Sequence, residues 1–242
     1  MDDFSSRLAK IQEAIADAAR RTGRDPAEID LIAVTKTQPA KVVQEALRAG
    51  LTHFGENKVQ EAHGKIETLG RGLWHLIGHL QSNKAKDAVR LFDSIDSVDR
   101  SDLAEELDHR AGAFGKIQNV LLQVNIAGES TKFGCAPDAA LALAETINAR
   151  PRLCLRGLMT LAPYSPEPEK SRPHFAGLRL LRDKIETSAG LRLPVLSMGM
   201  SGDFIVAIEE GATSVRIGTA LFGERLKLKR RLPEDPSFTE ST

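Results

Sequence analysis

Residues 31–50, LIAVTKTQPAKVVQEALRAG, contain one strand followed by one helix. The strand is the apolar run at 31–34, which is too short for a core helix and does not alternate with polar residues, as expected of a strand buried on both faces. A helix then begins at Pro39 and ends at Gly50, with proline early and glycine at its end. The stretch therefore predicts one β/α unit.

The same unit recurs between about residues 25 and 225. Seven further strands are expected at 52–55, 74–78, 92–95, 120–125, 154–159, 195–198 and 214–218. Helical segments separate them, around residues 56–69, 81–90, 100–113, 137–149, 168–189 and 202–210. Eight short strands alternating with helices indicate a parallel sheet in an α/β protein, and their number favours a (β/α)8 TIM barrel. A doubly wound open sheet is the alternative, because periodicity alone does not show that the sheet closes.

Two segments flank this predicted barrel core. Residues 1–24 carry apolar side chains at helical spacing and reach a glycine at Gly23, which predicts an extra N-terminal helix. Residues 227–242 form a polar tail, which is either a solvated end or an interaction element. We expect residues 1–242 to form a single domain.

The composition argues against several functional classes. The 242 residues include 33 Lys+Arg and 33 Asp+Glu, so the chain lacks the basic excess typical of proteins that bind nucleic acids or acidic membranes. It contains no apolar run of the ~20 residues that a membrane helix needs. The polar N-terminus has no secretory signal, and the only cysteines are Cys135 and Cys154, so we expect a soluble cytoplasmic protein.

Lys36 follows directly on the first predicted strand. The carboxyl ends of the strands form the active face of a (β/α)8 barrel, so this lysine is expected at the barrel mouth. Partial loss of solvent there would favour the neutral amine, which is the form that attacks an aldehyde. A solvated lysine at a strand end is the alternative.

Small residues follow the seventh and eighth predicted strands. Gly202 and Gly218 would allow backbone N–H groups to approach an anion, and Ser201 and Thr219 would offer hydroxyl donors. The loops after these two strands are the usual phosphate site of such barrels. The alternative is a pair of tight turns whose hydroxyls only cap helices. We favour a phosphate site.

Other polar residues at the strand ends are less informative. Arg216 shares a strand face with Gly218 and should point inward, where it needs an anion, such as a barrel carboxylate, or another acceptor. His75 and His79 span a strand and a turn without further ligand residues, so we expect no metal site and interpret His75 as a core histidine. Lys132 either belongs to a rim loop or contacts the phosphate, and the cysteines are interpreted as packing residues.

Several motifs, taken in this order, resemble the pyridoxal phosphate homeostasis protein family. They are IAVTKTQP (32–39), FGENKVQEA (54–62), WHLIGHLQSNK (74–84), KFG (132–134), RGLM (156–159), LSMGMSGDF (196–204) and VRIGTALFGER (215–225). The resemblance covers about residues 5–225. It implies a barrel like the N-terminal domain of alanine racemase, of PLP fold type III, with pyridoxal 5′-phosphate (PLP) at its mouth. The chain departs from the family pattern at His79, where a smaller residue or proline is usual.

The resemblance also implies which residues bind the cofactor. Lys36 would form an internal aldimine, Arg216 would face the pyridine nitrogen, and Asn57 would lie beside the ring. A guanidinium in that position would disfavour protonation of the ring nitrogen and weaken the ring as an electron sink. The phosphate-binding positions would be Ser201, Gly202, Gly218 and Thr219, with Met200, and by motif position His75 and Met159, near the site. No residue is assigned a catalytic role.

By this resemblance, the protein carries PLP reversibly and maintains intracellular PLP (vitamin B6) and amino-acid homeostasis without a robust catalytic activity. Racemase relatives use a second, β-rich domain that supplies a tyrosine, whereas here the sole tyrosine is Tyr164 in a proline-rich loop. We therefore expect a monomer that makes transient contacts with PLP-dependent apo-enzymes. The alternatives are a PLP-dependent amino-acid racemase and an aldolase that uses Lys36 without a cofactor.

Overall fold

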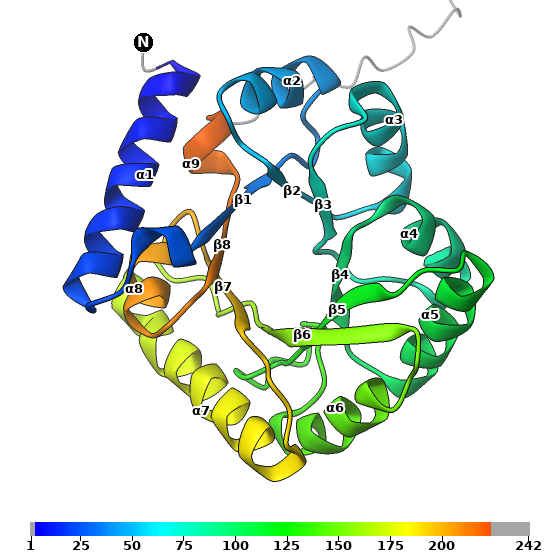
Figure 1. The fold of residues 1–242 in the computed structure, drawn as a ribbon. Helices are drawn as coiled ribbons and strands as arrows, with labels where there is room; N and C mark the ends of the chain where they lie inside the picture. The colour runs from blue at the N-terminus through cyan, green and yellow to red at the C-terminus, as the bar shows by residue number, and fades with distance from the viewer. Residues whose placement is uncertain (1–2, 224–242) are drawn as a thin grey trace, which may run out of the picture.

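Eight strands of the computed structural model form a closed barrel in which neighbouring strands run parallel (Figure 1). β1 pairs with β8 to close the ring, which places Ala33 beside Ile217. The strands are β1 (Asp30–Val34), β2 (His53–Glu56), β3 (Leu73–Leu76), β4 (Ser94–Val98), β5 (Gln118–Gln123), β6 (Leu153–Met159), β7 (Val195–Met200) and β8 (Ser214–Ile217). The predicted barrel is confirmed and the open-sheet alternative is wrong. The structure describes residues 3–223, so the predicted tail at 227–242 lies outside the described residues.

Helices surround the barrel as an outer ring (Figure 1). They are α1 (Phe4–Arg21), α2 (Ala40–Arg48), α3 (Val59–Leu69), α4 (Ala85–Leu91), α5 (Ser101–Ala113), α6 (Ala140–Asn148), α7 (Arg172–Ala189), α8 (Phe204–Glu209) and α9 (Thr219–Phe222). Short 3-10 turns lie at Pro26–Glu28, Ser82–Lys84, Pro137–Ala139 and Pro168–Ser171. No helix within residues 3–223 combines the length and the apolar character needed to cross a membrane.

The predicted N-terminal helix is α1. The Asp3 side chain accepts a hydrogen bond from the Ser6 N–H at 2.8 Å, which caps its first turn. Its buried face includes Leu8, Ile11 and Ile15, and the helix packs against α8 and α9, beside which it lies in Figure 1. This face removes apolar area from water, which is the main source of stability for an amphipathic helix.

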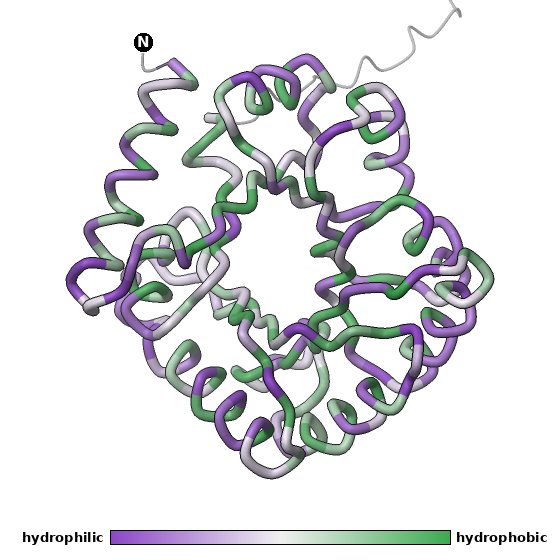
Figure 2. The backbone as a smooth tube through the Cα atoms, viewed as in Figure 1, coloured by the Kyte–Doolittle hydropathy of each residue, from purple (hydrophilic) through white to green (hydrophobic). Residues whose placement is uncertain are grey.

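The hydrophobic core lies mainly between the strands and the helices. Figure 2 shows hydrophobic residues along the strands and recurring along the helices, where hydrophilic residues separate them. The largest fully buried side chains include Phe54, Phe92, Phe175, Leu103 and Leu158. This core fixes the ring of strands and therefore the positions of the loops at their carboxyl ends.

β4 differs most from its prediction, since it spans Ser94–Val98 rather than 92–95. All five of its residues are buried, including Asp96 and Ser97. Their polar groups have partners: the Ser94 hydroxyl donates to Asp96, and the Ser97 hydroxyl donates to the Gly78 carbonyl at 2.7 Å. A polar strand can therefore be buried here because its hydrogen bonds are satisfied within the barrel.

A polar cluster lies near the N-terminal ends of β1 to β4. The ring of His75 is 3.1 Å from a carboxylate oxygen of Asp96 and 3.0 Å from the ring of His53. Burial alone would lower the pKa of His75, but the carboxylate of Asp96, together with Asp30 and Asp93, raises it above the ordinary value. Burial lowers the pKa of His53. His75 is therefore the histidine of this pair that is protonated first.

Replacing His75 with Gln is expected to destabilise the fold by about 1.5–3 kcal/mol at low pH, the usual contribution of a hydrogen bond to a charged group. Because the folded-state pKa of His75 is raised, its protonated form stabilises the fold below the ordinary histidine pKa. This contribution is lost as the pH rises through the folded-state pKa. Urea unfolding at about pH 5.5 and about pH 8.5 should show the larger loss at the lower pH.

The control for this experiment is His109→Gln, which changes an exposed histidine on α5. Its effect on the free energy of unfolding should be small at both pH values. A loss in His75→Gln that is equal at both pH values would contradict the proposed contribution of the protonated ring.

Candidate functional site

A cavity of about 670 Å³ opens at the carboxyl ends of the strands. Its volume lies within the usual range for small-molecule sites. The structure brings all eight predicted site residues to its wall: Lys36, Asn57, Met200, Ser201, Gly202, Arg216, Gly218 and Thr219. They come from segments after or at the ends of β1, β2, β7 and β8. The barrel therefore assembles residues that lie far apart in the sequence.

Lys36 lies two residues beyond the end of β1 and is half-buried. The N–H of Thr35 donates to the Gly55 carbonyl at 3.0 Å, which continues the β1–β2 pairing up to the lysine. Asn57 follows the end of β2 in the same way. Its backbone is so close to Gly78 that a Cβ on that glycine would lie 2.2 Å from the Asn57 carbonyl oxygen. Only glycine fits there, and this close packing fixes Asn57 at the cavity wall.

The turns after β7 and β8 lie side by side at the cavity. Asp203 closes the first turn, because one of its carboxylate oxygens accepts from the Met200 N–H at 2.7 Å. The Ser201 hydroxyl oxygen accepts from the Ala220 N–H at 3.3 Å and so joins the two turns. The other Asp203 oxygen accepts from the Ser171 hydroxyl at 3.0 Å. The predicted pair of small-residue turns is therefore held together by side-chain hydrogen bonds.

Backbone N–H groups on these turns are available to a ligand. Within residues 3–223, the N–H groups of Ser201, Gly202, Gly218 and Thr219 donate no hydrogen bond. The Ser201 hydroxyl keeps its own proton to donate, because it serves as an acceptor towards Ala220. These donors lie beside one carboxylate, that of Asp203, whose two oxygens already accept hydrogen bonds from the Met200 N–H and the Ser171 hydroxyl. The remaining donors form an arrangement suited to an anion.

Arg216 is almost fully buried in β8, at 3% exposure. Its guanidinium donates to the Ser197 hydroxyl at 2.6 Å and to the Thr160 carbonyl at 2.7 Å. Burial lowers its pKa to about 10, against the opposing effect of Asp96 and Asp203, so it remains protonated at neutral pH. Within the described residues its hydrogen-bond acceptors are neutral, and Arg216 is among the residues that line the cavity.

Sequence reasoning left Lys132 open between a rim loop and a phosphate contact, and it missed other parts of the wall. Lys132 pairs with Glu129 at 2.5 Å and donates to the Ala162 carbonyl at 3.0 Å, which places it on the cavity side of its loop. The segment 161–165, including the 92% exposed Tyr164, also lines the cavity. Asp203 could have been found, since an aspartate before a helix in an SGD turn is a common backbone acceptor. No sequence signal shows that the loops after β5 and β6 meet at this cavity, because only the closed barrel brings them together.

Two residues that the resemblance placed near the site do not line this cavity. His75 belongs to the polar cluster near the N-terminal ends of the strands, where it lines a separate cavity of about 170 Å³. Its ring therefore contacts Asp96 and His53 instead of this site. Met159 is fully buried in the core and is not among the residues that line the 670 Å³ cavity.

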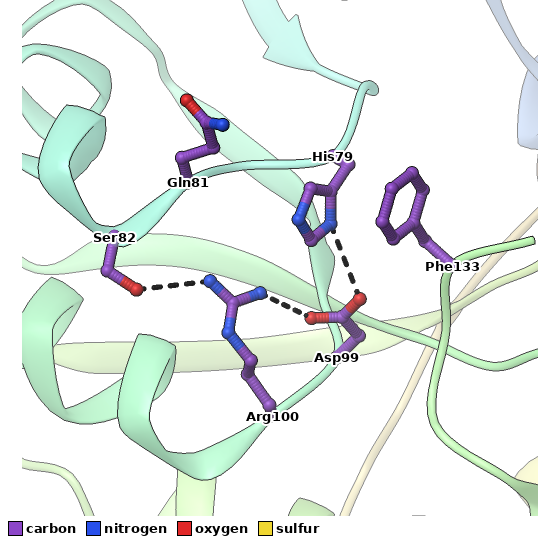
Figure 3. A pocket seen from close by; sticks show the side chains of 6 residues that line it. All are labelled: His79, Gln81, Ser82, Asp99, Arg100 and Phe133. Atoms are coloured by element: carbon purple, nitrogen blue, oxygen red, sulfur yellow. Dashed lines mark hydrogen bonds and ion pairs between the residues drawn. The ribbon is translucent and has the colours of Figure 1, made fainter.

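His79, the departure from the family pattern, borders a neighbouring pocket (Figure 3). Its ring stacks on Phe133, with centroids 3.7 Å apart, and faces Asp99 at 3.6 Å. Arg100 pairs with the same aspartate at 2.8 Å. The histidine thus makes an aromatic contact and lies beside a carboxylate, outside the main cavity.

Metal and thiol chemistry find no support in the described part of the chain. Residues 3–223 contain no group of three or more His, Cys, Asp or Glu side chains arranged to hold a metal ion. Both cysteines are free and half-buried, and burial raises the pKa of Cys135 to about 11, so its thiol is protonated and unreactive at neutral pH.

Known proteins are similar to this chain in sequence and in fold. The family model described as alanine racemase, N-terminal domain, matches residues 7–226. The pyridoxal phosphate homeostasis protein of Aquifex aeolicus is 46% identical over 90% of this chain and 97% of its own length, and that of Pseudomonas aeruginosa is 47% identical over 93% and 97%. The structure of PipY from Synechococcus elongatus PCC7942, with PLP bound, has 40% identity and a TM-score of 0.81, covering 91% of this chain and 100% of that one. The chain therefore belongs to the pyridoxal phosphate homeostasis proteins, within the family of the alanine racemase N-terminal domain.

Proposed function

We propose that this protein binds PLP reversibly in the 670 Å³ cavity, through Lys36, and thereby maintains the intracellular supply of PLP and the balance of amino acids. The observation that carries the proposal is the convergence of an amine, a buried guanidinium and unpaired backbone N–H groups on one cavity. The family membership of the chain and the PLP in the PipY structure support it.

The residues present fit the three chemical parts of this cofactor. When bound, PLP supplies an aldehyde, which condenses with a primary amine and releases water. Lys36 offers the primary amine, and the turns containing Ser201 and Thr219 offer donors for a phosphate. Apolar side chains of the wall, including Val34 and Ile77, suit the flat faces of an aromatic ring.

Arg216 is proposed to limit the chemistry at this site. Its guanidinium is protonated at neutral pH, and a positive charge beside a pyridine nitrogen opposes protonation of that nitrogen. A ring that stays unprotonated withdraws electrons less strongly. The arginine would therefore favour holding the cofactor over reactions that build up a carbanion.

We propose that the site has no efficient acid/base partner for Lys36. Two-base racemisation needs a proton donor and acceptor on both faces of the ring. In the described wall, Asp203 accepts from the Met200 N–H and the Ser171 hydroxyl, and Glu129 pairs with Lys132. These groups are already engaged in holding the loops. Binding and release of PLP are therefore the proposed activity, without a robust turnover.

An amino-acid racemase is the second candidate, because Tyr164, the sole tyrosine, does line the cavity. Its side chain is 92% exposed, so it would have to move inward to reach a bound ring.

The compartment, oligomeric state and partners of the protein are part of the same proposal. We propose a cytoplasmic monomer that passes PLP to apo-enzymes through transient contacts. The two free cysteines accord with a reducing compartment, and the balanced charge accords with a small-molecule ligand rather than a nucleic acid.

Lys36→Ala is expected to abolish the visible absorbance that develops when PLP is added to the protein, because the attacking amine is lost. Lys132→Ala is the matched control, since it removes a second lysine that lines the same cavity. Borohydride reduction followed by peptide mapping should place the modification on Lys36 in the native protein. Absorbance retained in Lys36→Ala would rule out this attachment point.

Ser201→Ala and Thr219→Ala should each weaken PLP binding by about 1.5–3 kcal/mol, the usual contribution of one hydrogen bond to a charged group. Pyridoxal, which has the same ring and aldehyde but no phosphate, serves as the comparison ligand. Its affinity should not change in either variant. If both variants bind PLP as the native protein does, the phosphate lies elsewhere.

Incubation of the PLP-loaded protein with single L-amino acids is expected to yield no more D-product than the same reaction with Lys36→Ala. Chiral chromatography measures the product. Steady formation of D-amino acid that Tyr164→Phe abolishes would establish the racemase candidate instead.

A further inference from the structure

A buried ion pair lies behind the wall of the cavity, between the barrel and α3. The Lys65 ammonium on α3 lies 2.6 Å from a carboxylate oxygen of Glu56 and donates to the Thr35 carbonyl at 2.7 Å. The Thr35 hydroxyl donates to the same Glu56 oxygen at 2.6 Å. Lys65 is 8% exposed, and Glu56 and Thr35 are fully buried. We call these three residues the Lys65 cluster.

The cluster directly precedes two residues of the cavity wall. Thr35 comes before Lys36, and Glu56 comes before Asn57. Because successive side chains of an extended strand point to opposite sides, the cluster faces α3 while Lys36 and Asn57 line the cavity. The peptide groups that carry the two site residues are thus anchored from behind.

The turn at Lys36 needs such anchoring. Thr37 has φ of +65°, and among residues 3–223 it is the only residue other than glycine with a positive φ. This conformation is unfavourable for a β-branched side chain. The Thr37 N–H approaches a carboxylate oxygen of Glu61 at 3.4 Å, and Glu61 lies one turn before Lys65 on α3. Helix α3 therefore holds the backbone on both sides of Lys36.

Stability alone is a poor reason for this arrangement. Burying an ammonium and a carboxylate costs desolvation energy that their attraction often only offsets, and apolar residues of similar volume often stabilise a fold as well or better. The second Glu56 oxygen is buried without a hydrogen bond in the described part of the chain, which adds to that cost. The pair instead provides directional hydrogen bonds. The Glu56 carboxylate accepts from the Thr35 hydroxyl and the Lys65 ammonium donates to the Thr35 carbonyl, which fixes Thr35 relative to β2 and α3.

We propose that Lys65, acting with Glu56, is a positioning residue that fixes the backbone turn of Lys36 so that its amine meets the PLP aldehyde in a productive orientation. This inference rests on the proposed function and adds a role for α3, none of whose residues lines the cavity. Lys65 does not touch the ligand in this scheme. It acts through its contacts with the Thr35 carbonyl and the Glu56 carboxylate.

The test uses two probes that differ at one group. PLP needs the amine of Lys36, whereas pyridoxine 5′-phosphate carries a hydroxymethyl group in place of the aldehyde and needs only the ring and phosphate contacts. In Lys65→Met the affinity for PLP should fall about ten- to a hundredfold, since a small misplacement of a reacting group has effects of this size. The affinity for pyridoxine 5′-phosphate should not change. A purely structural role would weaken both ligands together or neither, and either result overturns the proposal.

Lys116→Met is the matched control. Lys116 is half-buried and, like Lys65, donates to the backbone, in its case to the carbonyls of Val89 at 2.7 Å and Phe92 at 3.1 Å. It does not line the cavity. It should leave the affinities for both probes unchanged. If Lys65→Met does not fold, the double variant Glu56→Gln, Lys65→Met removes both charges and is tested in its place, with the same expected selectivity.

A cofactor-free measurement separates this inference from the proposed function. Hydrogen exchange of the backbone over residues 35–38 should be faster in the Lys65 variant than in the native protein, because the turn is released. Unchanged exchange there would overturn the inference even if PLP binds. Conversely, if borohydride traps no PLP on Lys36 of the native protein, the proposed function fails, whatever the exchange shows.

Discussion

The pairing of β1 with β8 is the contact on which the site depends. It sets Ala33 beside Ile217, and the chain then continues on each strand to Lys36 and to Thr219. The Lys36 amine and the turn after β8, where we propose that a phosphate binds, therefore share one cavity. No local interaction could bring them together, because nearly the whole barrel separates them in the sequence. Closure of the barrel is therefore what brings the Lys36 amine and the turn at Thr219 to the same cavity.

Much of this could be predicted from the sequence, because the strands are short apolar runs and each is followed by a recognisable turn. Lys36 and the turn containing Gly218 were found by their positions after such runs. β4 was placed too early because Asp96 and Ser97 read as the end of a strand, and only the folded barrel shows their partners. For His75, the residues alone indicate a core histidine, and only the motif resemblance places it near the site. Its motif gives its neighbours in the chain but not the end of the barrel to which its ring points.

The interior of the barrel contains charged side chains, and one of them affects the pKa of residues near both ends of the barrel. The carboxylate of Asp96 raises the pKa of His75 near one end and opposes the lowering of the Arg216 pKa near the other. The Asp96 carboxylate thus offsets part of the desolvation cost of a guanidinium whose hydrogen-bond acceptors within residues 3–223 are neutral. The polar cluster and the cavity are therefore electrostatically connected, although no residue lines both.

The packing of α1 carries a mechanical consequence. This helix lies against α8 and α9, which follow the turns after β7 and β8. The Arg7 guanidinium donates to the Leu221 carbonyl of α9 at 2.8 Å. Helix α1 thus supports α8 and α9 from the outside and helps to hold the turns that precede them. Proteolytic trimming, a bulky fusion or a partner protein that displaced α1 would therefore weaken the proposed phosphate site from outside, without altering any residue of that site.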